Sequence, residues 1–344
     1  MATMKDVAKK AGVAPITVSR VLNNPGSVAS ATKKKVMKAI EELNFKPNQI
    51  ARSMITRRTN TIGMLLSNIT NPYFPEVLLG LEVTARSQGK NLIICNAIDY
   101  ENTLRSLDVL LEKRVDGIIV APIEFPSVES QKEFYSYLES LSSKLSDQSI
   151  PVVFINNDLQ ETSLSCVSID NYLSARLAME HLLALGHKRI AHLTVERDVK
   201  VWIERLRGYK DMLASSGIAI DSSLIAMGSE DVESAERAAL ELLKRKERPT
   251  AVFAANDTLA IGVIHAANRL GLNVPRDLSV IGIDGTPLGL YIYPKLTSVS
   301  HPRFQIGEVS VKLIIDKING DTSNFNVTLK PELLARDSTG PVGE

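Results

Sequence analysis

Near the N-terminus, side chains able to donate and accept hydrogen bonds follow a short apolar pattern and a turn. Residues 6–20 read DVAKKAGVAPITVSR, and their apolar spacing predicts two short helices. Gly12 supplies a permissive backbone for the turn between them, and Pro15 suits the first turn of a helix that begins near Ala14. Two helices joined in this way form a helix-turn-helix, whose second helix reads base edges in the major groove of DNA.

The second predicted helix has an apolar face and a polar face. The residues predicted to face the core are Val18, Val21 and Leu22. The residues predicted to face the groove are Thr17, Ser19 and Arg20. Hydroxyl and guanidinium groups can hydrogen-bond to base edges, so this division suits a recognition helix.

The charge of the chain is divided between a basic head and an acidic remainder. Residues 1–60 contain twelve Lys or Arg against three Asp or Glu, a net charge of +9, which leaves −8 for residues 61–344. Because basic groups that neutralise phosphates release counterions, this balance favours nucleic acid over a membrane as the partner. A third helix is predicted from the apolar stripe Val36, Ala39, Ile40 and Leu43. A small basic three-helix domain without a ligand is the alternative reading of the head.

A basic linker follows the head. Residues 46–58 read KPNQIARSMITRR and predict a short helix that opens at Pro47 and Asn48, with one side lined by Ile50, Ala51 and Met54. A helix this short is marginal in isolation, so we expect it to form against a partner or DNA. An apolar side chain in such a helix can wedge between base steps of the minor groove.

From Thr61 onward, short apolar runs alternate with helical patterns, as in parallel sheets with crossover helices. The first set predicts strands at 61–66, 91–95, 117–121 and 152–155 and helices at 74–88, 101–114 and 128–145. The second set predicts strands at 165–169, 189–193, 251–254 and 279–283 and helices at 172–185, 203–216, 232–246 and 257–270. We therefore expect two doubly wound Rossmann-like lobes with a ligand site between them, beyond the carboxyl ends of the strands.

Several protein classes are disfavoured. The sequence has no apolar stretch of about 18 residues and no signal-peptide core, so we expect a cytoplasmic protein with no membrane partner. Cys95 and Cys166 lie in apolar runs and are predicted to be reduced core residues. The five histidines are scattered, and the phosphate-binding and nucleophile motifs of enzymes are absent. We expect no catalysis, no metal and no cofactor.

Over nearly its full length the chain resembles the LacI/GalR family of bacterial repressors. The head and linker carry KDVAKKAGV, TVSRVLN and ELNFKPNQIARSM, and the body carries NPYF, KRVDGIIV, VSIDN, GHKRIAHL, PTAVFAANDTLAIG, VPRDLSVIGID and PKLTSV. The resemblance implies a helix-turn-helix domain at 1–46, a hinge helix and linker at 47–60 and an effector-binding and dimerisation domain at 61–344. Its body is of periplasmic-binding-protein type, with an N-lobe of about 61–159 and 292–322 and a C-lobe of about 160–291 and 323–344.

The resemblance further implies a homodimer on a near-palindromic operator, with paired hinge helices in the minor groove. The residues expected to contact DNA are Thr3, Lys5, Pro15, Ile16, Thr17, Ser19, Arg20, Asn23, Asn48, Ile50, Ala51 and Met54. Pro15 and Ile16 stand where the family varies most with operator sequence, and neither offers a side-chain donor. We expect apolar contacts there, for instance with thymine methyl groups. Met54 stands where the family usually has leucine.

A small molecule, most plausibly a sugar or sugar derivative, is the implied effector. The cleft residues implied by the resemblance are Tyr73, Phe74, Arg205, Asn256 and Asp284. Arg205 and Asp284 can bind vicinal hydroxyls, and Tyr73 or Phe74 can stack on a sugar face. Further candidates are Asn156, at the end of a predicted strand, and the single tryptophan, Trp202.

One departure from the family pattern concerns this pocket. Many relatives have an aromatic residue two positions after a glycine, where it stacks on the ligand, but this chain reads Gly228, Ser229, Glu230. Trp202 can take the stacking role, or it can simply pack at the start of a helix. The alternatives are a purine or a partner protein as effector, or a sugar-binding protein that is not a regulator. As a DNA-binding regulator the protein would be nucleoid-associated, and the sequence leaves open whether the effector is an inducer or a corepressor.

Overall fold

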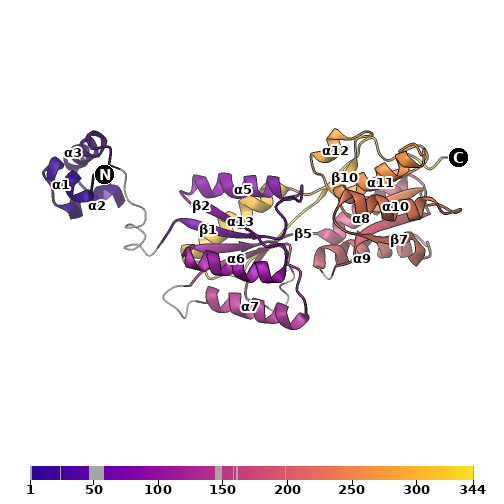
Figure 1. Cartoon of the computed structure of the whole chain (residues 1–344), viewed down its shortest axis with the longest axis horizontal. Helices are drawn as coiled ribbons and strands as arrows, with labels where there is room; N and C mark the ends of the chain where they lie inside the picture. The colour runs from indigo at the N-terminus through magenta and orange to yellow at the C-terminus, as the bar shows by residue number, and fades with distance from the viewer. Residues whose placement is uncertain are drawn as a thin grey trace. The chain divides into compact units, whose positions relative to one another are not determined.

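The computed structural model describes residues 2–23, 25–45, 58–143, 149–157, 159, 162–197 and 199–343. It divides into two compact units, Met1–Thr59 and Asn60–Glu344, which we call the head and the body (Figure 1). No helix in these described ranges is long and apolar enough to cross a membrane.

The head is helical, as predicted. It contains α1 (Met4–Ala11), α2 (Pro15–Asn23), the 3₁₀ turn η1 (Pro25–Ser27) and α3 (Ser30–Glu42). A capping box starts α1: the Thr3 hydroxyl accepts from the Asp6 N–H at 3.3 Å, and the Asp6 carboxylate accepts from the Thr3 N–H at 2.8 Å. Gly12 ends α1 with φ of 66°, the left-handed conformation that glycine adopts without strain. The predicted helix-turn-helix is confirmed.

A small apolar core joins the three helices. Its buried members are Val7, Ala8, Val18, Val21, Val36, Ala39 and Phe45. Leu22, Ile40 and Leu43 pack against this core while partly exposed, so the predicted apolar faces of the second and third helices are confirmed. An ion pair of 2.8 Å between Lys10 and Glu42 joins α1 to α3 at the surface.

The body has two lobes, each built on a six-stranded sheet. In the N-lobe the strand order is β11-β5-β4-β3-β1-β2 and all pairs are parallel. The strands are β1 (Thr61–Leu66), β2 (Asn91–Asn96), β3 (Gly117–Val120), β4 (Val152–Ile155), β5 (Ser165–Ile169) and β11 (Asn326–Leu329). The helices are α5 (Phe74–Ser87), α6 (Tyr100–Glu112), α7 (Val128–Ser142) and α13 (Arg303–Ile318). Helices α5 and α13 cover one face and α6 and α7 the other (Figure 1).

The C-lobe repeats this plan. Its strand order is β12-β10-β9-β8-β6-β7, in which β12 is antiparallel to β10 and the other pairs are parallel. The strands are β6 (Ile190–Val195), β7 (Ile225–Gly228), β8 (Ala251–Ala254), β9 (Ser279–Asp284), β10 (Thr297–Ser300) and β12 (Glu332–Leu334). The helices are α8 (Asn171–Ala184), α9 (Lys200–Ser215), η2 (Ser222–Leu224), α10 (Val232–Leu243), α11 (Asp257–Arg269) and α12 (Leu288–Tyr291). The predicted fold class, a helical head with two doubly wound lobes, is confirmed.

The predicted lobe boundaries were wrong. Strand β5, assigned to the C-lobe, pairs in parallel with β4 in the N-lobe sheet, and β11 joins that sheet beside β5. Strand β10, assigned to the N-lobe, lies between β9 and β12 of the C-lobe sheet. Two neighbouring parallel strands are usually joined by a crossover helix. The described part of 156–164, between β4 and β5, contains no helix. The alternation of strands and helices therefore predicts that the C-lobe begins at β5, which is one strand too early.

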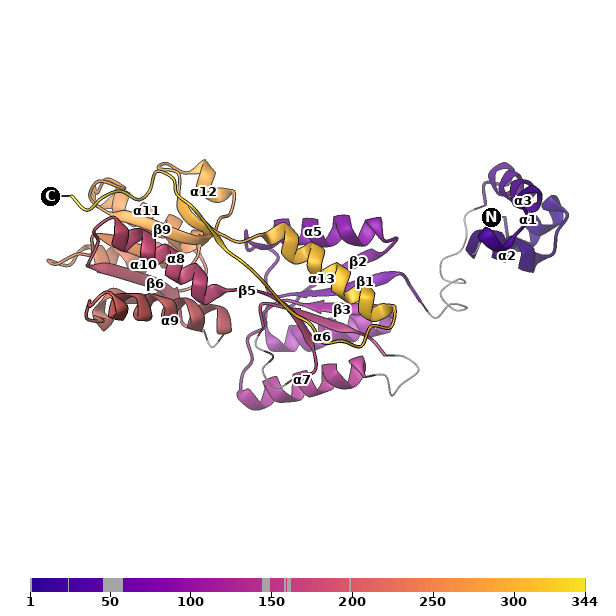
Figure 2. The ribbon, with the colours of Figure 1, turned by 180° about the vertical axis from the view of Figure 1, so that it is seen from behind.

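The chain passes between the lobes three times, after β5, after β10 and after β11 (Figure 2). The second passage leads into α13, which the sequence pattern did not identify. Helices α13 and α5 approach closely because both have glycine at the crossing. A Cβ atom on Gly80 would collide with the backbone oxygen of Phe304, and one on Gly307 with that of Val77. This packing fixes the N-lobe helix that begins beside the pocket.

Candidate functional site

A pocket lies between the two lobes of the body, at the carboxyl ends of their parallel strands. The segments that follow β1, β2, β3 and β4 line it from the N-lobe, and those that follow β6, β7 and β8 line it from the C-lobe together with the last residue of β9. The cavity measures about 170 Å³. All the residues predicted to contact an effector line it: Tyr73, Phe74, Asn156, Trp202, Arg205, Asn256 and Asp284.

Arg205 is held rigidly at the buried end of the pocket. Its Nε donates to Asn171 Oδ1 at 3.0 Å, its Nη1 donates to the backbone oxygen of Ala255, and its Nη2 donates to Asp284 Oδ1 at 3.3 Å. The guanidinium carbon also lies 5.3 Å from the ring centroid of Trp202. A guanidinium has five N–H donors, so two remain for a ligand after these bonds.

Asp284 ends β9 with an unusual backbone and a buried carboxyl. Its φ of 109° lies in a region that non-glycine residues rarely adopt, which aims the side chain at the pocket. Burial raises the pKa of this carboxyl to about 7, against the lowering effect of the Arg205 charge. The Oδ1 atom faces Arg205, whereas Oδ2 has no hydrogen-bond partner among the described residues.

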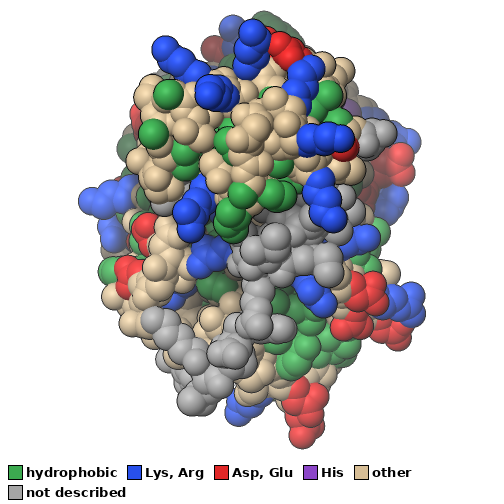
Figure 3. Space-filling model, turned by 90° about the vertical axis from the view of Figure 1, so that its left-hand side faces the viewer, with side chains coloured by type: hydrophobic (Ala, Val, Ile, Leu, Met, Phe, Trp, Pro, Cys, Tyr) green, Lys and Arg blue, Asp and Glu red, His purple; other side chains and the backbone are tan. Residues whose placement is uncertain are grey.

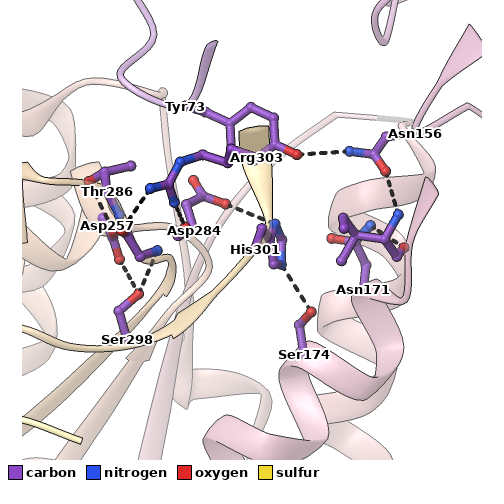
Figure 4. A network of polar contacts seen from close by, with 12 residues as sticks. Tyr73, Asn156, Asn171, Ser174, Asp257, Asp284, Thr286, Ser298, His301 and Arg303 are labelled. Atoms are coloured by element: carbon purple, nitrogen blue, oxygen red, sulfur yellow. Dashed lines mark hydrogen bonds and ion pairs between the residues drawn. The ribbon is translucent and has the colours of Figure 1, made fainter. Parts of the chain in front are cut away.

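The two asparagines of the pocket have different roles. Asn256 caps α11 by accepting from the Leu259 N–H at 2.8 Å, which leaves its amide donors for a ligand. Asn156 accepts from the Ile169 N–H at 2.7 Å and donates to the Tyr73 hydroxyl at 3.3 Å (Figure 4). Asn156 therefore positions Tyr73, and its second amide N–H remains for a ligand.

Aromatic side chains supply the apolar walls. Tyr73 and Phe74, just before and at the start of α5, meet edge to face with centroids 5.3 Å apart and planes at 88°. Trp202 packs in the C-lobe core and also lines the pocket, and its stacking on a ligand stays a prediction.

A polar network beneath Asp284 was not predicted. The Ser174 hydroxyl donates its proton to the Asp170 oxygen at 2.8 Å, so the His301 Nε2 must be the donor to Ser174 at 3.1 Å. The bare Nδ1 then lies 3.7 Å from Asp284 Oδ1 (Figure 4). Burial and the charges of Arg205 and Arg303 hold the pKa of His301 well below its ordinary value, which keeps the ring neutral. The sequence does contain a signal for His301 as a site residue, because this histidine directly follows the carboxyl end of β10.

Arg303, at the start of α13, connects the two lobes behind the pocket. Its guanidinium donates to the backbone oxygens of Asp284 and Gly285 in the C-lobe. Its Nε also donates to Glu76 on the N-lobe helix α5 at 2.9 Å. Neither Arg303 nor Glu76 belongs to a pattern that predicts this role from the sequence.

A second group of charged residues spans the exposed end of the pocket. Arg197, after β6, pairs with Glu124 at 3.2 Å, after β3 in the N-lobe, and with Glu230 at 3.1 Å, after β7. Asn71 donates to Glu230 at 3.4 Å from the N-lobe side. Glu230 thus occupies the pocket wall at the position where the family pattern has an aromatic residue.

In the head, the DNA-facing candidates differ in exposure. Pro15, Ile16 and Arg20 are exposed on α2, with Ile16 at 60%, and Lys5 is exposed on α1. Thr17 and Ser19 are partly buried, the Thr3 hydroxyl caps α1, and Asn23 ends α2. Asn48, Ile50, Ala51 and Met54 lie outside the described residues. Lysine and arginine side chains stand out over the upper part of the face in Figure 3.

Family comparisons match both units. Residues 3–48 match the model for bacterial regulatory proteins, lacI family, and residues 179–339 match a periplasmic binding protein-like domain. The HTH-type transcriptional repressor PurR of Vibrio atlanticus (strain LGP32) is 35% identical over 340 residues, which cover 98% of both chains. The chain belongs to the lacI family of bacterial regulatory proteins.

Solved structures of this family share the fold. The lac repressor dimer bound to operator and the anti-inducer ONPF has a TM-score of 0.86 and 26% identity, covering 98% of this chain and 99% of its own. A LacI family regulator from Enterococcus faecium with bound ribose has a TM-score of 0.72 and 30% identity, covering 82% of this chain and all of its own. This LacI-family protein is a DNA-binding transcriptional repressor with a ligand-binding body. Like its relatives, it is not an enzyme.

Proposed function

We propose that this repressor is a homodimer on a near-palindromic operator and that a small sugar bound between its lobes controls it. The observation that carries the effector class is the buried end of the pocket, where Arg205 and Asp284 face each other beside Asn256. Such a set donates to and accepts from neighbouring hydroxyls at once. Since operator DNA is the target, the protein acts at the nucleoid, in the cytoplasm.

The size of the pocket supports a ligand of about one ring. The cavity of about 170 Å³ is comparable to a cavity of roughly 150 Å³ that holds one benzene molecule. Phe74 and Trp202 offer apolar surface to the face of a sugar ring. The E. faecium relative holds ribose in its body, which favours the same class here.

A purine is the second candidate, and the pocket favours it less. A flat base gains most when aromatic rings stack on both of its faces, and Tyr73 and Phe74, at 88° to each other, do not form such a parallel pair. Glu230 stands where an aromatic wall would be needed.

A thermal-shift panel tests the effector class. The full-length protein is heated with D-ribose, D-glucose, D-galactose, mannitol, hypoxanthine and guanine in parallel. A ligand at about a hundredfold over its Kd stabilises by roughly 2.7 kcal/mol, a shift of about 5 °C for a body of this size. A shift with a sugar, lost in Asp284→Ala, supports the proposal, and a shift with a purine alone contradicts it.

For the head, we propose that the exposed residues of α2 read the operator. Pro15 and Ile16 make apolar contacts, while Thr17, Ser19 and Arg20 supply hydrogen bonds. Selection of bound duplexes from a random pool measures this directly. A recovered sequence with two inverted half-sites supports a dimer that docks two recognition helices. A single half-site would contradict it.

The homodimer is also supported by exposed apolar side chains on and beside α12. Leu288, Leu290, Tyr291 and Tyr293 are exposed, the last two at 80% and 90%. Apolar surface gathered in this way commonly marks a protein interface. Sedimentation velocity tests it, and we expect Tyr291→Asp with Tyr293→Asp to shift the protein from dimer to monomer. Wild type that sediments as a monomer at micromolar concentration would overturn the homodimer.

A further inference from the structure

The exposed end of the pocket is acidic. Asp99, Glu124 and Glu230 line it around a single guanidinium, that of Arg197. Asp284 and Arg205 lie at the other, buried end, and no lysine or histidine is among the described lining residues. The exposed end of the pocket therefore has more negative than positive charge.

Arg197 cannot balance its end of the pocket. It pairs with Glu124 at 3.2 Å and with Glu230 at 3.1 Å, so one positive charge is shared between two carboxylates. The other guanidinium, on Arg205, is directed to Asp284 at 3.3 Å. Two of the three carboxylates at the exposed end are therefore left without a counter-charge of their own.

Glu230 is the carboxylate on which this lack of counter-charge has the largest effect. Its side chain is only 18% exposed, and burial raises its pKa, to which the Glu124 charge adds while Arg197 and Arg205 oppose it. A carboxylate can accept about four hydrogen bonds. Described residues provide two, from Arg197 and from Asn71 at the long distance of 3.4 Å. Deeper in the pocket, the Asp284 carboxyl is at least nine-tenths buried, and its Oδ2 has no partner among the described residues.

We propose that the effector carries a protonated amine, as an amino sugar does, and that Glu230 receives the amine while Arg205 and Asp284 hold ring hydroxyls. This inference rests on the proposed sugar-binding function. An ammonium brings three N–H donors and one positive charge, which together supply what Glu230 lacks. A sugar phosphate or a sugar acid would add charge of the sign already in excess.

The ion pairs of Arg197 also join the lobes, because Glu124 follows an N-lobe strand and Arg197 a C-lobe strand. If these residues only joined the lobes, they would affect all ligands alike. Matched ligands that differ in one group separate this structural role from recognition.

The experiment is calorimetric titration of the full-length protein with D-glucosamine, D-galactosamine and D-mannosamine. Each is compared with its parent sugar and its N-acetyl derivative, which keep the ring but lack the charge. We expect at least one amine to bind about tenfold or more tightly than both of its neutral counterparts. In Glu230→Gln this ratio falls toward one, because the amide keeps the shape and loses the charge. Glu233→Gln, on an exposed residue of α10 outside the pocket lining, leaves the ratio unchanged.

The outcomes separate the two proposals. A parent sugar that binds as tightly as its amine overturns the amine inference and leaves the sugar-binding function standing. An amine preference that survives in Glu230→Gln also overturns the inference, because another group would then receive the nitrogen. If none of these sugars binds, the amine inference fails, and the sugar-binding function is decided by the thermal-shift panel, which also contains D-ribose and mannitol.

Discussion

Asp284 makes the stability of the ligand-free body depend on pH in a way that can be calculated. Its carboxyl has a pKa of about 7 in the folded protein, because burial outweighs the nearby Arg205 charge, against an ordinary value of 3.8. Between these values the folded state holds a proton that the unfolded chain has released. Stability from this group is therefore present at low pH and is lost as pH rises toward about 7.

The size of the effect follows from the two pKa values. Between pH 5.5 and pH 8 the contribution of Asp284 falls by about 2 kcal/mol. Asp284→Asn keeps the shape of the side chain and removes the titration. As the pH rises over this range, we expect the free energy of unfolding of the variant to increase by about 2 kcal/mol relative to that of wild type. Urea unfolding, followed by the fluorescence of Trp202, the single tryptophan, measures this difference.

A partly exposed aspartate, Asp277, provides the matched control. Hydrogen bonds from Asn273 and Arg276 lower the pKa of Asp277, so this group stays ionised throughout the range. The difference between wild type and Asp277→Asn should therefore not change from pH 5.5 to pH 8. A difference for Asp284→Asn that is equally constant would refute the reasoning, since it would mean that Arg205 and Arg303 keep the carboxyl ionised.

Further predictions concern the head and the lobe packing. Arg20→Ala should cost about 1–3 kcal/mol of specific DNA affinity, by fluorescence anisotropy, with unfolding unchanged within about 0.5 kcal/mol. Met54→Ala should lower operator affinity more than non-specific affinity at fixed salt; an unchanged ratio would contradict a minor-groove wedge. Gly307→Ala should destabilise by about 1–3 kcal/mol in urea despite the better helix propensity of alanine, because the added Cβ meets the Val77 oxygen. As a control, Lys312→Ala at an exposed position of the same helix should have little effect on the free energy of unfolding. A Gly307→Ala variant as stable as wild type would rule out the close crossing of α5 and α13.

Much of the site was predictable because its residues follow strands. Polar residues directly after a buried apolar run lie at the carboxyl edge of a parallel sheet, which identifies Asn156. Asn256 and Asp284 also lie at the ends of strands, but the family resemblance is what implied them. The helix-turn-helix was predictable for a similar reason: the spacing of apolar residues and the glycine turn are local properties. What each residue bonds to is not local. Asn156 lines the pocket, but its bonds to the Ile169 N–H and the Tyr73 hydroxyl join residues far apart in the chain and follow from no local pattern.

The lobe boundaries were wrong because sheet membership depends on distant partners. Strand β11 is recognised as part of the N-lobe only through its pairing with β5, about 160 residues earlier in the chain. Its own residues, Asn326–Leu329, are a short run with exposed positions that resembles many edge strands. Alternation of strands and helices predicts the elements, but not which sheet receives them.

The same three passages explain how a ligand can act on both lobes. The second passage places Arg303 where its guanidinium bonds the backbone of Asp284 and Gly285 in the C-lobe and Glu76 in the N-lobe. Glu76 lies in the first turn of α5, two residues after Phe74 of the pocket wall. A change in the angle between the lobes must therefore alter either these bonds or the positions of the groups that contact the ligand. A ligand that fits one angle better than the other shifts the balance between them by its difference in affinity, which is the physical requirement for control of the repressor.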